Sequence, residues 1–386
     1  MAKEKIRTIG EKNKILANIV EAITKRHYFL LLGHTSPDDD CIASTVSFAL
    51  ILHMFYKSAL VYLGSQIHER FRYLLDICKY NSIRVLAPDS PPPEKIDTIV
   101  LCDTPKPSMM EGRDFISRIP LNPNLIRIEV DHHLGADSEY FGDPGYRLVT
   151  EASSSSELIG HILLKLKERK DLLESYQISD LFPRNLVLAI LTGIIGDSNM
   201  GQFLKSPRER RYYQIFSSMF NDMLAQTTIK KSNFFTMAEV YGELQKLSTR
   251  EEGCFNAMMQ RKRFSPSIGY IALSAAESAD LSASFDEDTI VSTARVVADR
   301  LAEESAKLSL VAFYDSAPKS DLIQFRVRRS SMYKKFDLRT ILTLFSIPNG
   351  GGHEGAIAFR VPRNKVPDFQ SYIEKLVSGI EAALPA

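Results

Sequence analysis

The chain has 386 residues, of which 44% are apolar and 25% are charged, and its formal net charge is +1. This composition is typical of a folded globular protein and excludes a disordered one, because enough apolar surface is present to offset chain entropy. The near-zero net charge argues against a protein that follows long DNA or RNA by neutralising many phosphates. It leaves room for a small phosphorylated substrate, which needs only a local cluster of donors.

The four cysteines indicate a reducing compartment rather than a disulfide framework or a zinc knuckle, because no two of them form a CxxC pair. We expect buried thiols at Cys41, Cys78, Cys102 and Cys254. The first residues lack the apolar core of a signal peptide, and no apolar run is long enough to cross a membrane. We therefore expect a cytoplasmic protein that has no membrane partner.

The first 210 residues alternate short apolar runs with amphipathic stretches. Short runs rich in Leu, Ile and Val, bounded by Gly, Pro, Asp or Ser, are typical of buried strands in a parallel sheet. We predict such strands at 28–32, 60–63, 83–86, 98–102 and 125–130. Helical patterns are found at 42–56 and 154–168, and a more apolar helix is expected at 185–195. This alternation predicts an α/β domain with a doubly wound, mainly parallel sheet.

The remaining residues predict helices and then a second, smaller domain. Residues 205–250 mix charged and apolar side chains at helical spacing. Further strands are expected at 268–273, 308–314 and 322–327, with helices at 292–304 and 369–384. We therefore predict a catalytic domain at 1–210, a helical linker at 211–254 and a C-terminal α/β domain at 255–386.

Histidine and aspartate side chains follow three of the predicted strands and the apolar helix. In chain order they are His34, Asp38 and Asp40 after the first strand, Asp103 after the fourth, Asp131-His132-His133 after the fifth, and Asp197 after the helix. Ligands of open α/β sheets bind beyond the carboxyl ends of the strands, so we expect these side chains to meet there. Carboxylates gathered in one place repel one another unless cations neutralise them.

Each of these residues also has a structural interpretation. A single Asp after a strand is most often a helix N-cap or a turn residue, and we expect no more than that of Asp39. The ordered set as a whole favours a site for two divalent ions. His and Asp ligands suit Mn²⁺, Fe²⁺, Co²⁺ or Mg²⁺, and two such ions could clamp a phosphate and activate a water. We assign no role to His27, His53, His68 and His161.

The ordered motifs resemble those of the DHH phosphoesterase family, which is named for the triplet found here at 131–133. The segments at 34–40, 102–104 and 196–198 resemble further motifs of the family, and 152–158 resembles the segment after the triplet. The second domain resembles the family's DHHA1 partner, whose glycine-rich signature is matched by Gly350, Gly351, Gly352 and His353. The resemblance spans nearly the whole chain and implies a stand-alone DHH–DHHA1 phosphoesterase.

The resemblance also implies a role for each motif residue. One ion is expected at His34 and Asp38 and a second at Asp40, His132 and Asp197, with Asp103 shared between the two. His133 is expected to contact the scissile phosphate. Asp131 is expected to orient a histidine, the usual task of a carboxylate beside a ligating imidazole. Asp103, Asp131 and His133 are therefore the expected catalytic residues.

The second domain is expected to recognise the substrate. Gly350–Gly352 would let backbone N–H groups approach a phosphate closely, although a glycine triplet alone is usually a turn. We expect His353 to bind beside them. Arg328 and Arg329 end a predicted strand, and either grip a terminal phosphate or form a solvated strand edge. Period-two alternation places Arg326 and Arg328 on one face of this strand and Arg329 on the other.

We therefore predict a hydrolase that uses two divalent ions, Mn²⁺ ahead of Mg²⁺, Co²⁺ or Fe²⁺, to activate a hydroxide against small nucleotide phosphoesters. Similar proteins act on short oligoribonucleotides, on dinucleotides such as pApA and cyclic di-AMP, or on 3′-phosphoadenosine 5′-phosphate. Two alternatives stay open: a catalytically silent nucleotide sensor on the same fold, and a single-strand-specific exonuclease of the same superfamily. The resemblance also suggests a homodimer.

Overall fold

The structure of the protein is a computed structural model. It describes residues 2–385 except 65–66, 88, 92, 94, 120–123, 136, 226–233, 235, 317–319 and 349. The chain forms two compact units, Met1–Lys246 and Leu247–Ala386, and each is described here by itself.

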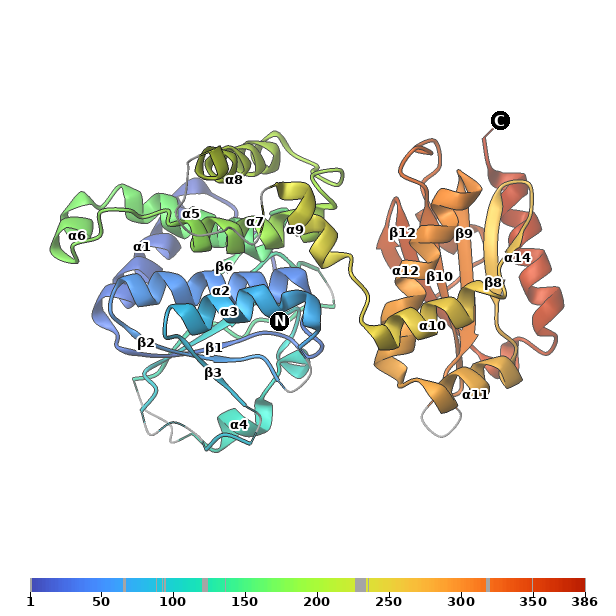
Figure 1. The fold of residues 1–386 in the computed structure, drawn as a ribbon, viewed down its shortest axis with the longest axis horizontal. Coiled ribbons are helices and arrows are strands. Elements are labelled where there is room, and N and C mark those ends of the chain that lie inside the picture. The colour runs from blue at the N-terminus through green and yellow to red at the C-terminus, as the bar shows by residue number, and fades with distance from the viewer. Residues whose placement is uncertain are drawn as a thin grey trace. The chain divides into compact units, whose positions relative to one another are not determined.

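The first unit is built on a six-stranded parallel sheet (Figure 1). Its strands are β1 (Tyr28–Leu32), β2 (Ser58–Tyr62), β3 (Arg84–Leu86), β4 (Thr98–Cys102), β5 (Ile126–Asp131) and β6 (Arg147–Val149). The order β3-β2-β1-β4-β5-β6 reverses direction between β1 and β4. This is the order of a doubly wound sheet, and its ligands bind where the order reverses.

Helices cover both faces of this sheet (Figure 1). On one face lie α1 (Ile9–Lys25), α2 (Asp39–Met54), α3 (Arg72–Tyr80), α5 (Ser155–Lys167) and α7 (Arg184–Ser198). The short α4 (Arg113–Ser117) covers the other face. The unit also contains η1 (Glu69–Phe71), η2 (Pro107–Met109), α6 (Lys170–Ser175), α8 (Pro207–Ala225) and α9 (Met237–Leu244).

Strand alternation divides the apolar side chains between two cores. Phe29 and Leu31 of β1 belong to the larger core beneath α2 and α7, whereas Leu30 and Leu32 belong to the smaller core with Phe115 of α4. Both faces of the strand are therefore buried, which explains its continuous apolar sequence. Each fully buried Leu or Ile contributes about 1.5–3 kcal/mol of transfer free energy.

The second unit is built on a six-stranded mixed sheet. Its strands are β7 (Arg263–Phe264), β8 (Ile268–Ala272), β9 (Leu308–Tyr314), β10 (Leu322–Arg329), β11 (Gly350–His353) and β12 (Ala356–Pro362). The order is β11-β12-β10-β9-β8-β7, in which β8 and β9 are parallel and the other pairs antiparallel. Its helices are α10 (Thr249–Met259), α11 (Ala275–Ser284), α12 (Glu287–Ser305), α13 (Arg339–Leu344) and α14 (Phe369–Ala383), with η3 (Arg363–Lys365).

These findings confirm the predicted fold class, an α/β protein with a parallel sheet followed by a smaller α/β unit. The division between the units falls after Lys246, within the stretch 211–254 where we expected a helical linker. Part of that stretch, 226–233 and 235, lies outside the described residues. Phe216 and Phe220 of α8 and Val240 of α9 are buried in the larger core of the first unit. These two helices are therefore part of the first unit's fold.

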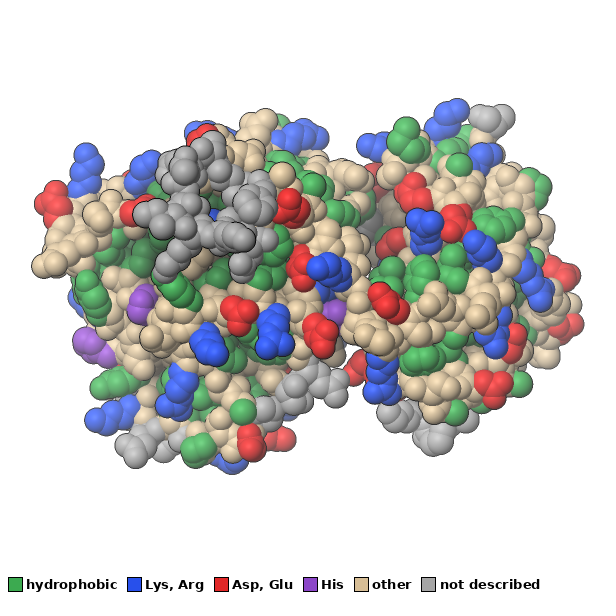
Figure 2. Space-filling model, in the orientation of Figure 1, with side chains coloured by type: hydrophobic (Ala, Val, Ile, Leu, Met, Phe, Trp, Pro, Cys, Tyr) green, Lys and Arg blue, Asp and Glu red, His purple; other side chains and the backbone are tan. Residues whose placement is uncertain are grey.

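The surface carries charges of both signs. Acidic and basic side chains are mixed over the face seen in Figure 2. Among the helices that the structure describes, none is both long and apolar enough to cross a membrane.

Candidate metal centre

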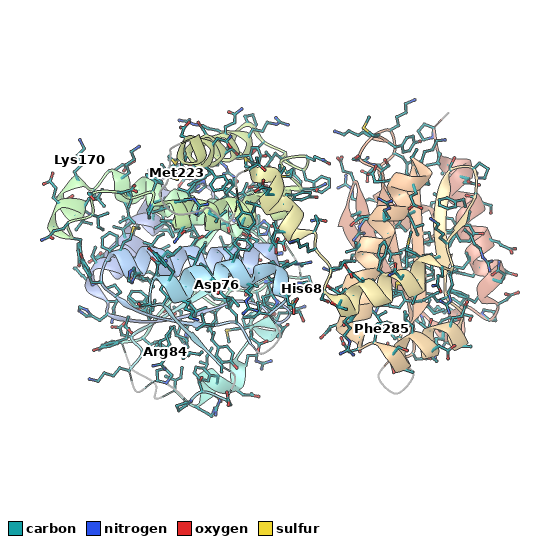
Figure 3. All side chains as sticks on the ribbon, in the orientation of Figure 1. His68, Asp76, Arg84, Lys170, Met223 and Phe285 are labelled. Carbon is teal, nitrogen blue, oxygen red and sulfur yellow. The ribbon has the colours of Figure 1, made fainter. Side chains whose placement is uncertain are left out.

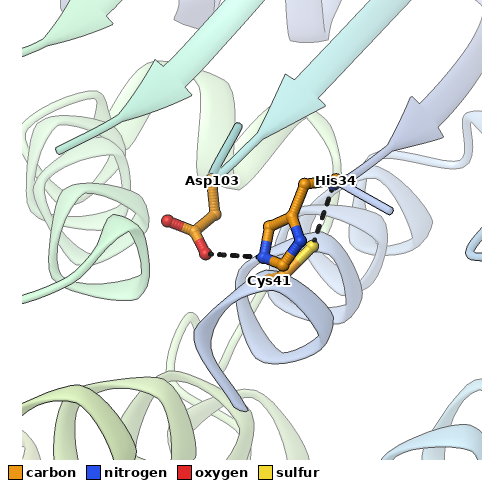
Figure 4. A group of neighbouring side chains, drawn as sticks. All are labelled: His34, Cys41 and Asp103. Atoms are coloured by element: carbon orange, nitrogen blue, oxygen red, sulfur yellow. Dashed lines mark hydrogen bonds and ion pairs between the residues drawn. The ribbon is translucent and has the colours of Figure 1, made fainter. Parts of the chain in front are cut away.

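The candidate site begins where the strand order reverses. β1 runs through Gly33 into His34, and β4 runs directly into Asp103. The His34 Nε2 atom lies 3.7 Å from an Asp103 oxygen (Figure 4). Gly33 is required beside them, because an added Cβ would lie 2.2 Å from the sulfur of Cys41. The first two predicted motifs therefore meet at the carboxyl edge of the sheet.

The start of α2 supplies the next carboxylates. Asp38 is the N-cap of α2 and accepts a hydrogen bond from the Cys41 N–H at 3.2 Å. Its carboxylate also lies 3.6 Å from His34 Nε2. Asp39 is the first residue of the helix and faces Arg70 at 3.5 Å, away from the candidate ligand groups. The N-cap interpretation thus applies to Asp38, which is at the same time part of the site.

Asp40 is fully buried, and its carboxylate is held by the start of another helix. Its two oxygens accept hydrogen bonds from the backbone N–H groups of Ser155, at 2.5 Å, and Ser156, at 2.9 Å. These groups are the free donors of the first turn of α5, where a negative charge is favoured. Burial, and next the charge of Asp103, nevertheless raise the pKa of Asp40 to about 7.

Asp103 is the centre of the cluster. The Ser155 hydroxyl donates to its carboxylate at 3.0 Å, His132 Nε2 lies at 3.4 Å and His133 Nδ1 at 3.6 Å. Its backbone φ is +49°, in the left-handed region that non-glycine residues adopt rarely. Strained backbone of this kind is typical of functional sites, where the surrounding structure holds it in place.

The triplet at the end of β5 has one buried carboxylate and two histidines. Asp131 is fully buried and accepts hydrogen bonds from the backbone N–H of His133, at 3.2 Å, and from its Nδ1, at 2.8 Å. Burial alone would raise the pKa of Asp131, but the hydrogen bond from His133 and the charge of Lys3 lower it to about 2. The carboxylate that we expected to orient a histidine thus contacts His133 and not His132.

His132 lies in the second expected ligand group, together with Asp40 and Asp197. Its Nε2 atom lies 3.3 Å from Asp197, which sits in the last turn of α7. Burial alone would lower the pKa of His132, but its contact with Asp103 and the charge of Asp197 raise it well above the usual range. Burial and the charge of Asp40 likewise raise the pKa of Asp197. Both shifts favour the protonated forms of these groups, and a bound cation would displace those protons.

The cluster fits divalent cations. Within the described part of the chain, three groups have ligand atoms within 4.8 Å of one another: His34, Cys41 and Asp103; Asp103, His132 and His133; and Asp40, His132 and Asp197. Carboxylate and imidazole donors suit Mn²⁺, Mg²⁺, Fe²⁺ or Co²⁺. Asp40 and Asp197, two neighbouring carboxylates with raised pKa values, are the arrangement that a cation relieves. Cys41 adds one buried sulfur.

The structure brings all eight motif residues of the first unit together, and it keeps other histidines apart from them. His68 caps η1, where its Nδ1 accepts the Arg70 N–H at 3.1 Å (Figure 3). His161 is buried beside Glu157 and Tyr212.

Ser155 and Lys3 are among the residues that contact the cluster and that the sequence did not reveal. Ser155 lies in the segment that resembles the family, but only the fold shows that it donates to Asp103. Lys3 is 1% exposed, and its ammonium contacts Asp131. Its partner lies so far along the chain that no local pattern could have revealed it.

In the second unit, the arginines of β10 lie on two faces. Arg326 pairs with Ala358 of β12, and Ala358 pairs with Gly351 of β11, so all three lie in one row across the sheet. Arg328 lies on the same face as Arg326. Arg329 lies on the opposite face, where it donates to the carbonyl of Phe336 at 2.7 Å.

The Arg329 guanidinium also lies 3.4 Å from a Glu354 oxygen, and its expected contact with a phosphate stays a prediction. Gly350 and Gly352 are crowded, since an added Cβ would lie 2.6 Å from Leu342 and 2.1 Å from the Ala356 carbonyl oxygen. A Cβ on Gly351 would meet no described atom within 4 Å, and all three glycines are exposed. His353 ends β11, and its side chain lies outside what the structure describes.

Comparison with known proteins identifies the first unit. Residues 28–194 match the model of the DHH family, N-terminal domain. This segment is therefore a DHH-family N-terminal domain, and the resemblance to the family is confirmed for it. No curated protein matches the chain significantly. Assignment of the second unit to the DHHA1 type stays a prediction.

Solved structures are similar over nearly the full chain. An exopolyphosphatase-related protein from Bacteroides fragilis is 15% identical with a TM-score of 0.56, over 96% of this chain and 95% of that chain. A pGpG-specific phosphodiesterase from Vibrio cholerae is 12% identical with a TM-score of 0.35, over 92% of this chain and 99% of that chain. The first of these likenesses supports the fold.

Proposed function

We propose that the protein is a metal-dependent phosphoesterase that hydrolyses small nucleotide phosphoesters. The observation that carries this proposal is the convergence of three histidines and five aspartates at the carboxyl edge of a DHH-family sheet. A protein that only bound nucleotides would have no need of several buried carboxylates facing one another, because a phosphate is itself an anion.

The chain's own residues divide into two ligand groups. His34 and Asp38 would hold one cation, Asp40, His132 and Asp197 a second, and Asp103 would be shared by both. Bound there, such ions supply Lewis acidity and lower the pKa of a water to generate a nucleophile. Asp40 and Asp103 are fixed in place by α5 through three donors, so the ligand geometry exists before a cation arrives.

His133 is the residue placed to contact the phosphate. Its side chain is 40% exposed, whereas Asp131 below it is buried. Asp131 and Asp103 both lie on the Nδ1 side of the ring, at 2.8 and 3.6 Å. A ring that donates through Nδ1 leaves Nε2 uncommitted, and Nε2 donates to a phosphate oxygen or a leaving group when it is protonated as well.

Substrate recognition is proposed for the arginine face of the second sheet. Burial, and then the charges of Arg295, Arg328 and Arg360, lower the pKa of Arg326 to about 10. Four cations gathered around Arg326 favour the binding of an anion. Two carboxylates act on this group: Asp299, which pairs with Arg328 at 3.0 Å, and Asp315.

One competition assay tests the proposal. The protein with Mn²⁺ is given cyclic di-AMP, pApA and 3′-phosphoadenosine 5′-phosphate together, and the products are separated by chromatography. We expect selective loss of one substrate, which disappears in the Asp103→Asn variant. We expect Arg326→Ala to raise KM with little change in kcat, because it removes binding and not chemistry. If nothing is consumed while nucleotides still bind, the protein is a sensor.

A further inference from the structure

Lys3 is a lysine buried as completely as a core side chain. It is 1% exposed, although lysines are almost never fully buried unless they are paired. Its ammonium contacts a carboxylate oxygen of Asp131, a carboxylate oxygen of Glu129 at 2.8 Å and the carbonyl oxygen of Thr104 at 2.6 Å. The contacts with Asp131 and Thr104 are hydrogen bonds, and the contact with Glu129 is an ion pair.

The backbone of Lys3 is fixed as firmly as its side chain. Its N–H donates to the Ser138 hydroxyl at 3.2 Å, and its carbonyl accepts the N–H of Gly135 at 3.1 Å. The next residue, Glu4, donates its N–H to the Tyr140 hydroxyl at 2.8 Å. The start of the chain is therefore bound along the segment that directly follows the DHH triplet.

The contact with Lys3 completes the surroundings of Asp131. One oxygen of Asp131 accepts both hydrogen bonds from His133, and the other oxygen faces Lys3. Glu129, two residues earlier on β5, shares the same ammonium, and its second oxygen accepts the N–H groups of Phe141 and Gly142. Without Lys3, two buried carboxylates would face each other and one oxygen of Asp131 would lose its donor.

We propose that Lys3 is a positioning residue for the reaction: it holds the Asp131 carboxylate in the orientation that fixes the ring of His133. This inference rests on the proposed function, because it assigns the effect of Lys3 to the residue that contacts the phosphate. A substitution that fills the same space without the charge should preserve the fold but allow the His133 ring to change its orientation. Lys3→Met is that substitution, since it keeps the apolar stem.

The first measurement compares kcat, KM, metal content and Tm. For Lys3→Met we expect kcat to fall by about 10–100-fold, the usual effect of losing a group that orients a ligating or catalytic histidine. KM and metal content should stay close to the wild type. The matched control is Lys5→Met, because Lys5 is exposed and lies 3.4 Å from an exposed Glu151. This control should behave as the wild type.

A double variant separates positioning from stability. Lys3→Met together with Glu129→Gln removes one positive and one negative charge from the same buried group. We expect this pair to recover most of the Tm lost in Lys3→Met while kcat stays low. Recovery of kcat along with Tm would show that Lys3 is only a structural residue and would overturn the proposal.

A second readout does not depend on activity. Long-range ¹H–¹⁵N NMR of the His133 ring reports which ring nitrogen carries the proton. We expect one Nδ1–H form in the wild type and in Lys5→Met, and a mixture of forms in Lys3→Met. If the wild type hydrolyses none of the nucleotides, the proposed function fails, but this comparison still decides on Lys3. An unchanged ring in Lys3→Met would overturn the positioning role.

Discussion

Asp103→Asn is the substitution that tests the centre of the site most directly. Asn has nearly the same shape as Asp and is among the few residues that accept a positive φ, so the backbone value of +49° can be kept. An alanine there would add backbone strain to the loss of charge. Any loss of function in Asp103→Asn therefore reports the missing negative charge.

The expected magnitude follows from the distances. The Asp103 carboxylate lies 3.7 Å from His34, 3.4 Å from His132 and 3.6 Å from His133, and it is shared by both proposed ligand groups. One unit charge at ~4 Å is worth about 4 kcal/mol at an effective dielectric constant near 20. Since each 1.4 kcal/mol is a factor of about ten, kcat should fall by about three orders of magnitude or more.

The assay measures kcat, bound metal and Tm on the same preparation. Bound metal should fall together with kcat, whereas the metal-free Tm should stay the same or rise, because one of several mutually repelling carboxylates is gone. Asp171→Asn is the control, since Asp171 forms a surface ion pair with Arg169 at 2.7 Å. A kcat within a few-fold of the wild type, with full metal content, would refute the shared-ligand assignment.

Three further predictions concern packing, pH and metal. Gly193→Ala should abolish metal binding, because its Cβ would lie 2.5 Å from an Asp40 oxygen. Gly242→Ala, whose Cβ would meet no described atom within 4 Å, should instead stabilise α9 by about 0.5–1 kcal/mol in urea unfolding. Equal effects of the two substitutions on metal binding and on stability would contradict this. Burial lowers the pKa of His161 to about 4, below its value in the unfolded chain. Its contribution of about 3 kcal/mol to the free energy of unfolding is therefore complete above pH 6.5 and is lost as the pH falls through 4. A His161→Gln variant whose free energy of unfolding depends on pH in the same way as that of the wild type would argue against this. Increasing concentrations of Mn²⁺ should raise the Tm of the wild type, measured by scanning calorimetry, and should raise that of Asp197→Asn much less. An identical rise in both proteins would exclude Asp197 as a metal ligand.

Much of the first unit follows from its sequence because the local signals agree with the fold. The apolar runs at 28–32 and 98–102 are the strands β1 and β4, and each ends directly before a site residue. Strand β6 was missed, because Arg147–Val149 is too short to give a periodic pattern. The amphipathic α1 was missed as well.

The contacts that complete the site could not be predicted, because they join residues far apart in the chain. Asp40 accepts hydrogen bonds from the backbone of Ser155 and Ser156, whose N–H groups are free only because α5 begins there. The partner of Asp131 is Lys3, at the opposite end of the unit's sequence. In β10, by contrast, simple alternation correctly separated Arg326 and Arg328 from Arg329.

The packing of α2 against α7 has a consequence for how the protein tolerates mutation. Most residues of both helices are buried, and the start of α2 carries Asp38 and Asp40 while the last turn of α7 carries Asp197. Helices packed so closely do not adjust separately, since a dense interior transmits small displacements. A cavity cut deep between them, as by Leu191→Ala, would therefore disturb ligands in both helices at once. We expect such core variants to lose metal affinity before they lose their fold, so the interior of this unit is under functional constraint well away from the site.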